Sequence, residues 1–268
     1  MSNNLMQGHD ADILRVTGLS KKFGGLKATD GVTFSVKENS ITALIGPNGA
    51  GKTTVFNLIT NIFPPDAGTV AFFGKEIVGW SPMAIANLGL IRTFQSARVF
   101  PGLTVLENVM VGRHRLVKSG GLSQMLWSSS SRREETGIRA QAESMLKIVG
   151  LDRYKDEHAV DLPMGAQKLL EVVRAVMSSP RLLCLDEPAA GLNDTETEEL
   201  AALLRAIRAA GISILVVEHN MSLVMNVADH VVVLDAGKVI AAGPAAEVQR
   251  NPQVIEAYLG REHDDAAA

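Results

Sequence analysis

Hydrophobic and polar residues alternate along the chain in blocks that predict strands followed by helices. Short apolar runs occupy residues 41–45, 182–185 and 212–217, and each precedes a stretch with the apolar spacing of a helix. This order predicts a mostly parallel sheet covered by helices. Residues 13–36 differ, because short alternating segments are separated there by glycine and aspartate. We expect them to form an N-terminal antiparallel β subdomain whose strands add to the same sheet.

The middle of the chain is predicted to be an inserted, mostly helical subdomain, at about residues 98–162, because it lacks a convincing strand pattern. Residues 115–137 within it are rich in glycine, serine and basic residues. They are too polar for a core and longer than most loops, so we expect an inserted loop or a helical hairpin. The whole pattern predicts one domain at 12–260, with flexible tails at 1–11 and 261–268.

Composition supports a globular domain and argues against nucleic acid as a partner. The chain has 268 residues, of which 46% are hydrophobic and 21% charged, enough to bury a sizeable core. Disorder or a fibre does not fit this composition. The net charge of -3 and the isoelectric point near 6.1 give no overall basic field to attract nucleic acid.

The sequence has no segment that predicts a membrane span or a secretory signal. No apolar run approaches the roughly 18 to 20 residues that cross a bilayer, and the N-terminus lacks a cationic start followed by an apolar stretch. A membrane role must therefore come through a partner. The single cysteine, Cys184, lies in an apolar run, which suits a buried side chain in a reducing cytoplasm.

The strongest chemical signal is a glycine-rich loop with the spacing G-x-x-x-x-G-K-[ST] between an apolar strand and a helical pattern. Its glycines let backbone N–H groups point at phosphate oxygens, and the following helix adds its positive end. The lysine is expected to meet the β- and γ-phosphates of ATP, and the threonine hydroxyl to bind Mg²⁺. The predicted nucleotide-binding residues are Gly46, Pro47, Asn48, Gly49, Ala50, Gly51, Lys52, Thr53 and Thr54.

A second signal is a pair of carboxylates, Asp186 and Glu187, directly after the apolar run at 182–185. The carboxyl ends of parallel strands face the ligand crevice. There Asp186 can hold Mg²⁺ through its water shell, and Glu187 can deprotonate the attacking water. The alternative is a strand that ends in a solvated acidic turn. The predicted fold class is thus an α/β P-loop nucleoside triphosphatase core with the two subdomains described above.

The residues around these motifs resemble the ATPases of ABC transporters from about Ile13 to Gly260. The resemblance implies that Phe23 stacks on adenine, although a single phenylalanine is more often part of a core. It implies that Gln95 senses magnesium, as a ligand near the catalytic centre, and links the site to the membrane partner. It also implies that His219, at the end of another apolar run, contacts the γ-phosphate. The other five histidines lack such a context and are expected at the surface.

The family's signature, normally Leu-Ser-Gly-Gly-Gln, is present only in altered form at residues 162–167. Leu162, Gly165 and Gln167 are the residues that the resemblance places against the nucleotide of the opposite subunit. Pro163 removes the signature hydroxyl and has no N–H, which should weaken this chain's contribution to its neighbour's site. Asn193 stands where the family usually has aspartate. These departures favour pairing with a different companion ATPase, with a pair of identical chains as the alternative.

Further stretches resemble the importers of branched-chain amino acids, in particular EPAAGLN at 187–193 and NPQVIEAYLG at 251–260. The resemblance implies the ATPase subunit that carries the longer insertion. It also implies integral membrane permeases and a solute-binding protein as partners, and the cytoplasmic face of the cell membrane as location. Urea, amides or aromatic acids are alternative cargoes, and lipopolysaccharide export is an alternative system. An ABC ATPase of DNA repair would add a zinc module or long heptads, and a soluble kinase would not explain the motif set.

Overall fold

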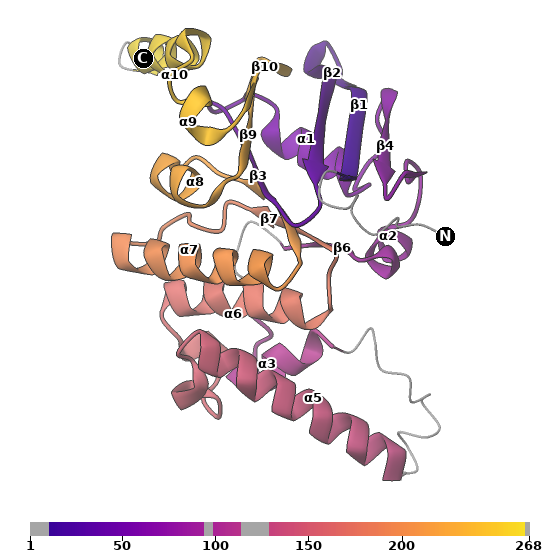
Figure 1. Ribbon diagram of the computed structural model, residues 1–268, viewed down its shortest axis with the longest axis vertical. Helices are drawn as coiled ribbons and strands as arrows, with labels where there is room; N and C mark the ends of the chain where they lie inside the picture. Colours follow the sequence, from indigo (N-terminus) through magenta and orange to yellow (C-terminus); the bar gives the residue numbers. More distant parts are fainter. Residues whose placement is uncertain (1–10, 94–98, 114–128, 266–268) are drawn as a thin grey trace, which may run out of the picture. The chain divides into compact units, whose positions relative to one another are not determined.

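The computed structural model describes residues 11–93, 99–113 and 129–265, with side chains described at 11–93, 99–113 and 132–258. These residues fall into two compact units (Figure 1). The first comprises residues up to Arg92, together with 181–190 and the chain from Leu204 onward. The second comprises 93–180 and 191–203, so it includes the predicted helical subdomain at 98–162.

Ten strands, all in the first unit, form two separate sheets in the described part of the chain (Figure 1). The strands are β1 (Asp12–Phe23), β2 (Leu26–Lys37), β3 (Ile41–Ile45), β4 (Ala67–Phe72), β5 (Lys75–Glu76), β6 (Leu90–Arg92), β7 (Leu182–Asp186), β8 (Ser213–Val217), β9 (His230–Asp235) and β10 (Lys238–Gly243). One sheet has the order β10-β9-β3-β8-β7-β6, and only its β10-β9 pair is antiparallel. The other, β2-β1-β4-β5, is antiparallel throughout.

The described helices follow the strands in the predicted alternation. They are α1 (Lys52–Ile59), α2 (Pro82–Leu88), α3 (Val105–Val111), α5 (Ser129–Ile148), α6 (Met164–Met177), α7 (Asp194–Ala209), α8 (Met221–Val227), α9 (Ala245–Val248) and α10 (Pro252–Asp265). Local sequence fixes several starts. Ser81 and Asn220 cap α2 and α8 with their side chains, and Thr104 forms a capping box with Glu107 at the start of α3.

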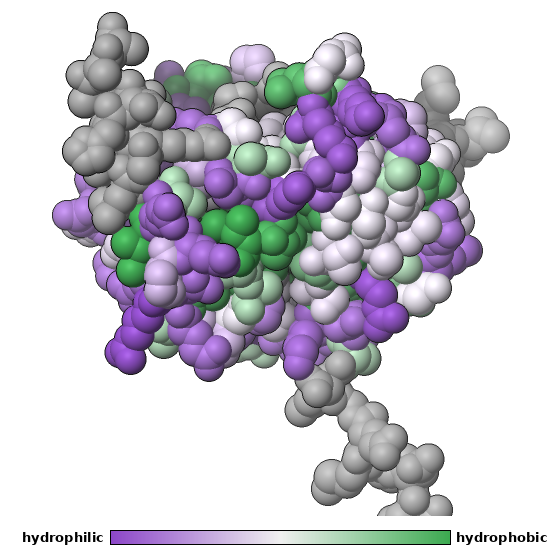
Figure 2. Space-filling model, turned by 90° about the horizontal axis from the view of Figure 1, so that it is seen from above, coloured by the Kyte–Doolittle hydropathy of each residue, from purple (hydrophilic) through white to green (hydrophobic). Residues whose placement is uncertain are grey.

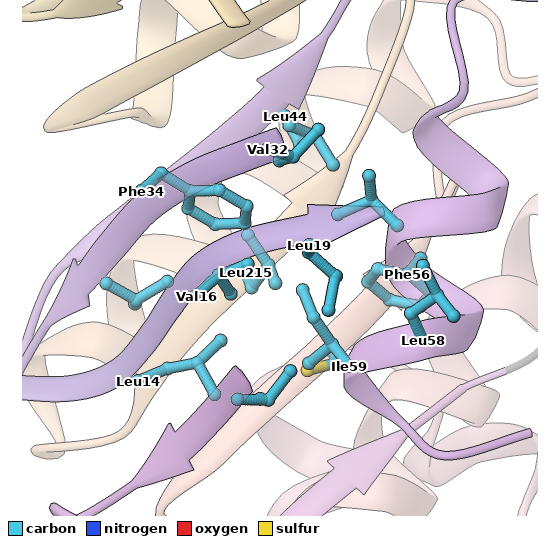
Figure 3. Packing of buried hydrophobic residues seen from close by; sticks show 14 of the residues in the cluster. Leu14, Val16, Leu19, Val32, Phe34, Leu44, Phe56, Leu58, Ile59 and Leu215 are labelled. Atoms are coloured by element: carbon cyan, nitrogen blue, oxygen red, sulfur yellow. The ribbon is translucent and has the colours of Figure 1, made fainter. Parts of the chain in front are cut away.

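The antiparallel strands do not add to the parallel sheet, and on this point the sequence prediction was wrong. Their apolar side chains instead form one cluster with α1 and with residues of the parallel strands, as Figure 3 shows for Leu14, Val16 and Phe34 beside Leu44 and Leu215. An alternating strand buries one face against another layer, whereas an added edge strand would share the face of its neighbours. The alternation at 13–36 was therefore the sign of a second layer.

The second unit is helical in its described part. It contains α3, α5, α6 and the first part of α7, with short 3-10 turns at Asp152–Tyr154 and Ala159–Asp161. Of the polar insertion predicted at 115–137, residues 129–137 form the start of α5, and 115–128 lie outside the described residues.

The sequence predicts a flexible tail at each end of the chain. The predicted N-terminal tail, 1–11, lies outside the described residues except for Ala11. The tail predicted to begin at 261 starts within α10, because this helix continues to Asp265.

No helix in the described part of the chain is both long and apolar enough to cross a bilayer. Figure 2 shows one face of the molecule, on which hydrophilic residues surround smaller groups of hydrophobic ones. Cys184 is fully buried in β7, as predicted, and burial raises the pKa of its thiol to about 12.

Candidate nucleotide site

The glycine-rich loop connects β3 to α1 in a conformation that requires glycine. Gly46 and Gly51 have φ angles of 150° and 99°. A Cβ atom on Gly46 would lie 2.1 Å from the Leu234 carbonyl oxygen, and one on Gly51 would lie 2.5 Å from that of Ala28. Larger residues would therefore clash with backbone as well as strain the loop. The loop then enters α1 at Lys52, so that the helix N-terminus faces the loop.

Lys52 is buried, and its ammonium group lies against the loop that precedes it. Its Nζ atom donates to the carbonyl oxygens of Gly46 at 2.7 Å and of Pro47 at 3.1 Å. These contacts hold a cation beside the N-terminus of α1. A lysine held in this way, next to backbone N–H groups, forms a cradle for an anion such as a phosphate.

A cavity of about 560 Å³ opens beside this loop, and all of its lining residues belong to the first unit. It is lined by Phe23, Leu26, Lys27, Ala28, Asn48, Gly49, Ala50, Gly51, Lys52, Thr53, Thr54, Glu187, Ala236 and Gly237. Most of the predicted phosphate-binding residues thus share one cavity with the second carboxylate of the acidic pair.

Asp186, by contrast, does not line this cavity and is buried. Its Oδ2 accepts from the Arg92 guanidinium at 2.9 Å, and its Oδ1 has no hydrogen-bond partner among the described residues. Burial raises the pKa of this carboxyl, and Arg92 opposes the rise. Arg92 itself donates to Asn57 Oδ1 on α1 at 2.6 Å and to Oγ1 of Thr60, the C-cap residue of α1, at 3.0 Å.

Glu187 and His219 lie together at the ends of the adjacent parallel strands β7 and β8. Glu187 has a φ angle of 49°, which is uncommon for a residue with a side chain and turns it away from the strand path. Its Oε2 is 4.0 Å from Nδ1 of His219, which is more than half exposed. The structure therefore brings the proposed base and the proposed phosphate-contacting histidine to one place.

Phe23 ends β1 at the mouth of the cavity and is 47% exposed, so it is not part of the core. Its ring meets that of Phe63 edge to face, with centroids 5.4 Å apart. Nζ of Lys21 lies 5.9 Å from each ring. An exposed aromatic ring with a fixed edge can offer its open face to a base.

The altered signature segment belongs to the second unit and begins α6. Leu162 is buried. The side-chain amide of Gln167 donates to the carbonyl oxygens of Val160 at 3.2 Å and Leu162 at 2.8 Å, and so stabilises the loop that precedes α6. Pro163 stands at the N-cap of α6 without a side-chain cap. Gly165 lets the side chain of Glu196 pack closely against the start of α6, because a Cβ atom at this position would lie 2.2 Å from Oε1 of Glu196.

Asn193, where the family usually has aspartate, acts here as a helix cap. Its Oδ1 accepts from the Glu196 N–H at 3.0 Å, and the Glu196 carboxylate accepts from the Asn193 N–H at 3.0 Å. This reciprocal pair is a capping box at the start of α7. Asparagine and aspartate cap about equally well, so the substitution preserves the turn.

Two residues that sequence reasoning missed are Arg92 and Glu218. Arg92 ends the short strand β6, and Glu218 directly follows β8 and is fully buried. A charged residue at the end of an apolar strand was the available signal in both cases. Gln95 lies outside the described residues. His230 is partly exposed and begins β9, where it pairs with Thr42 of the central strand β3.

A phosphate loop after the central strand of a parallel sheet, with a lysine in the cradle and a carboxylate on the same cavity, defines a P-loop nucleotide-binding protein. The sequence pattern of ABC transporters matches residues 29–190, and that of the branched-chain amino acid ATP-binding cassette transporters matches 238–264. The chain belongs to the ABC transporter family, as an ATPase subunit.

Curated relatives match nearly the full chain. The high-affinity branched-chain amino acid transport ATP-binding protein BraF of Pseudomonas aeruginosa is 42% identical over 249 residues, which is 92% of this chain and 98% of the relative. LivG of Escherichia coli, which carries the same description, is 41% identical with the same coverage. A probable LivG of Methanocaldococcus jannaschii is 35% identical over 93% of this chain and 98% of the relative.

Solved structures agree with this family. A nucleotide-free ATP-binding cassette from an ABC transporter superposes with a TM-score of 0.78 at 33% identity, over 92% of this chain and 99% of that one. The ADP conformation of an ATP-binding cassette of an ABC transporter gives a TM-score of 0.79 at 33% identity, over 93% and 99%. The predicted fold class and the predicted ATPase family are thereby confirmed.

Proposed function

We propose that this chain binds ATP with Mg²⁺ in the cavity beside the phosphate loop and hydrolyses it to power the import of branched-chain amino acids. One observation carries the proposal for the site, namely that Lys52 and Glu187 share a single cavity. The cargo is inferred from the curated relatives, which are described as high-affinity branched-chain amino acid transport proteins.

Each side chain has a distinct task in this proposal. Lys52 and the loop N–H groups hold the β- and γ-phosphates, and Phe23 stacks on the adenine. Glu187 accepts the proton of the attacking water on its carboxylate. His219 contacts the γ-phosphate, and Gln95 connects the site to the permease.

The residues present fit a magnesium ion. Thr53 is exposed at the cavity and offers a hydroxyl, and Asp186 offers a buried oxygen, Oδ1, that no described residue satisfies. Hydroxyl and carboxylate oxygens are the ligands that Mg²⁺ prefers, usually with several waters. When bound, the ion would neutralise phosphate charge.

We further propose that the chain works on the cytoplasmic face of the membrane with permease subunits, a solute-binding protein and a second, different ATPase subunit. The altered signature supports a mixed pair, because Pro163 caps α6 without a hydroxyl or an N–H to offer a phosphate. The isolated chain should then hydrolyse ATP slowly, and the mixed complex faster. Equal specific activity of the lone chain and of the complete transporter would contradict the mixed pair.

The proposed function is tested with Lys52→Ala in the full chain, with Lys75→Ala on β5 as a matched control, since Lys75 does not line the cavity. Lys52→Ala should abolish ATP binding or turnover, because it removes the cation from an otherwise backbone-lined cradle. The control should retain both. Full turnover in purified Lys52→Ala would refute the site. For the cargo, reconstituted transport should be competed by leucine, isoleucine and valine, and competition by urea alone would refute that part.

A further inference from the structure

Glu218 is a fully buried carboxylate directly beside the proposed catalytic residues, and the proposed function assigns it no task. It follows the last residue of β8, between Val217 and His219. In the described part of the chain no basic side chain forms an ion pair with it. Its charge is compensated by backbone N–H groups, and a buried carboxylate with such partners is held in one orientation.

The three backbone donors to Glu218 come from two different turns. Oε1 accepts from the N–H of Ala189 at 2.7 Å, and this turn follows β7. Oε2 accepts from the N–H groups of His219 at 3.0 Å and Asn220 at 3.2 Å, in the turn after β8. One side chain therefore joins the carboxyl ends of two adjacent parallel strands.

These two turns carry the proposed base and the proposed phosphate-contacting histidine. Glu187 is two residues before Ala189, and its positive φ angle of 49° requires support from its surroundings. The Glu187 carbonyl oxygen accepts from the Ala190 N–H at 3.2 Å, which closes the turn that Glu218 holds through Ala189. Glu218 thus contacts both the turn that follows Glu187 and the backbone of His219, and the side chains of Glu187 and His219 lie 4.0 Å apart.

We propose that Glu218 is a positioning residue for ATP hydrolysis, which fixes the Glu187 and His219 turns relative to each other. The inference rests on the proposed function. It assigns Glu218 no contact with nucleotide. Loss of its carboxylate should let the two turns move independently, and a displacement of the base by about 1 Å can lower a rate roughly 100-fold.

The test uses Glu218→Gln in the full chain, with Glu76→Gln, an exposed residue on β5, as the matched control. Glutamine preserves the size of the side chain but turns one acceptor into a donor that faces backbone N–H groups. We expect ATP affinity within about twofold of wild type, because the phosphate loop is unchanged, and a kcat lowered about 10- to 100-fold. The control should match wild type in both.

A double-mutant cycle separates positioning from a general structural role. If Glu218 acts through Glu187, adding Glu218→Gln to Glu187→Gln should lower the residual turnover no further. Additive losses, or an unchanged kcat in Glu218→Gln, would overturn the inference. If the glutamine variant does not fold, Glu218→Asp, which keeps the charge and retracts from Ala189, undergoes the same comparison. Normal turnover in Glu187→Gln alone would instead refute the proposed function.

Discussion

The ion pair between Arg92 and Asp186 leads to a prediction about stability. Their side chains are 14% and 2% exposed, and their nearest atoms, Nη2 and Oδ2, are 2.9 Å apart. We consider Arg92→Met, which keeps an unbranched apolar stem and removes the charged guanidinium. A buried carboxylate that loses its partner costs roughly 3–5 kcal/mol, and the slight exposure of Arg92 favours the lower end. At about 2–4 °C per kcal/mol for a chain of this size, the melting temperature should fall by roughly 6–12 °C.

The same variant should show a characteristic pH dependence. Burial already raises the pKa of Asp186, and without the opposing charge of Arg92 the pKa rises further. A carboxyl whose folded pKa is raised holds its proton more strongly in the folded state, so its destabilising effect grows as pH rises through that pKa. The deficit of Arg92→Met should therefore be larger at about pH 8 than at about pH 5.

The assay is thermal and urea unfolding of both forms at both pH values, with Arg15→Met as the matched control. Arg15 is exposed and pairs with Asp12 at 2.9 Å, so its loss should cost at most about 1 kcal/mol. The double variant Arg92→Met/Asp186→Asn should recover part of the lost stability, because no buried charge remains unpaired. An Arg92→Met deficit equal to that of the control, or one that does not change with pH, would refute the reasoning.

Two more predictions concern Phe23 at the cavity and His230 at the start of β9. Phe23→Ala should weaken ATP binding by roughly 1–3 kcal/mol, because it removes a stacking platform, and Phe23→Trp should bind ATP as tightly as the wild type. Equal ATP affinities of Phe23→Ala and the wild type, measured by fluorescence titration, would refute the proposed stacking. Burial lowers the pKa of His230, and Lys37 adds to this, so stability should fall as pH drops below about 6.5. His230→Gln should lose less stability at acid pH than the wild type. If the free energy of unfolding fell equally with pH in both forms, the prediction would be contradicted.

Much of the fold could be predicted from local pattern. Apolar runs at 41–45 and 182–185 gave two buried parallel strands, because strands covered on both faces are continuously hydrophobic. The sheet to which the N-terminal strands belong could not be predicted from local pattern. Their alternation shows that one face is buried, but the partner layer is decided by long-range packing on α1 and β8.

Some residues of the candidate site could likewise be predicted from sequence, and others could not. The phosphate loop and the acidic pair stand out in sequence because phosphate chemistry needs adjacent residues in a fixed order. Arg92 and Glu218 do not stand out, since each acts on a residue brought close by folding. Arg92 reaches Asp186 across 94 positions, and Glu218 reaches Ala189 across 29. Their signals were single charged residues at strand ends, which have many other causes.

The central claim is that Glu187 is the base of an ATP-hydrolysing site in which Asp186 serves the metal. It is tested most directly by measuring ATP affinity and single-turnover hydrolysis of Glu187→Gln and Asp186→Asn beside the wild type, with Mg²⁺ and the companion subunit present. Glu187→Gln should bind ATP nearly normally and hydrolyse it roughly 10²- to 10⁴-fold more slowly. Asp186→Asn should lose magnesium-dependent binding as well as turnover. Normal hydrolysis in both variants, or lost binding in Glu187→Gln with binding kept in Asp186→Asn, would contradict the account.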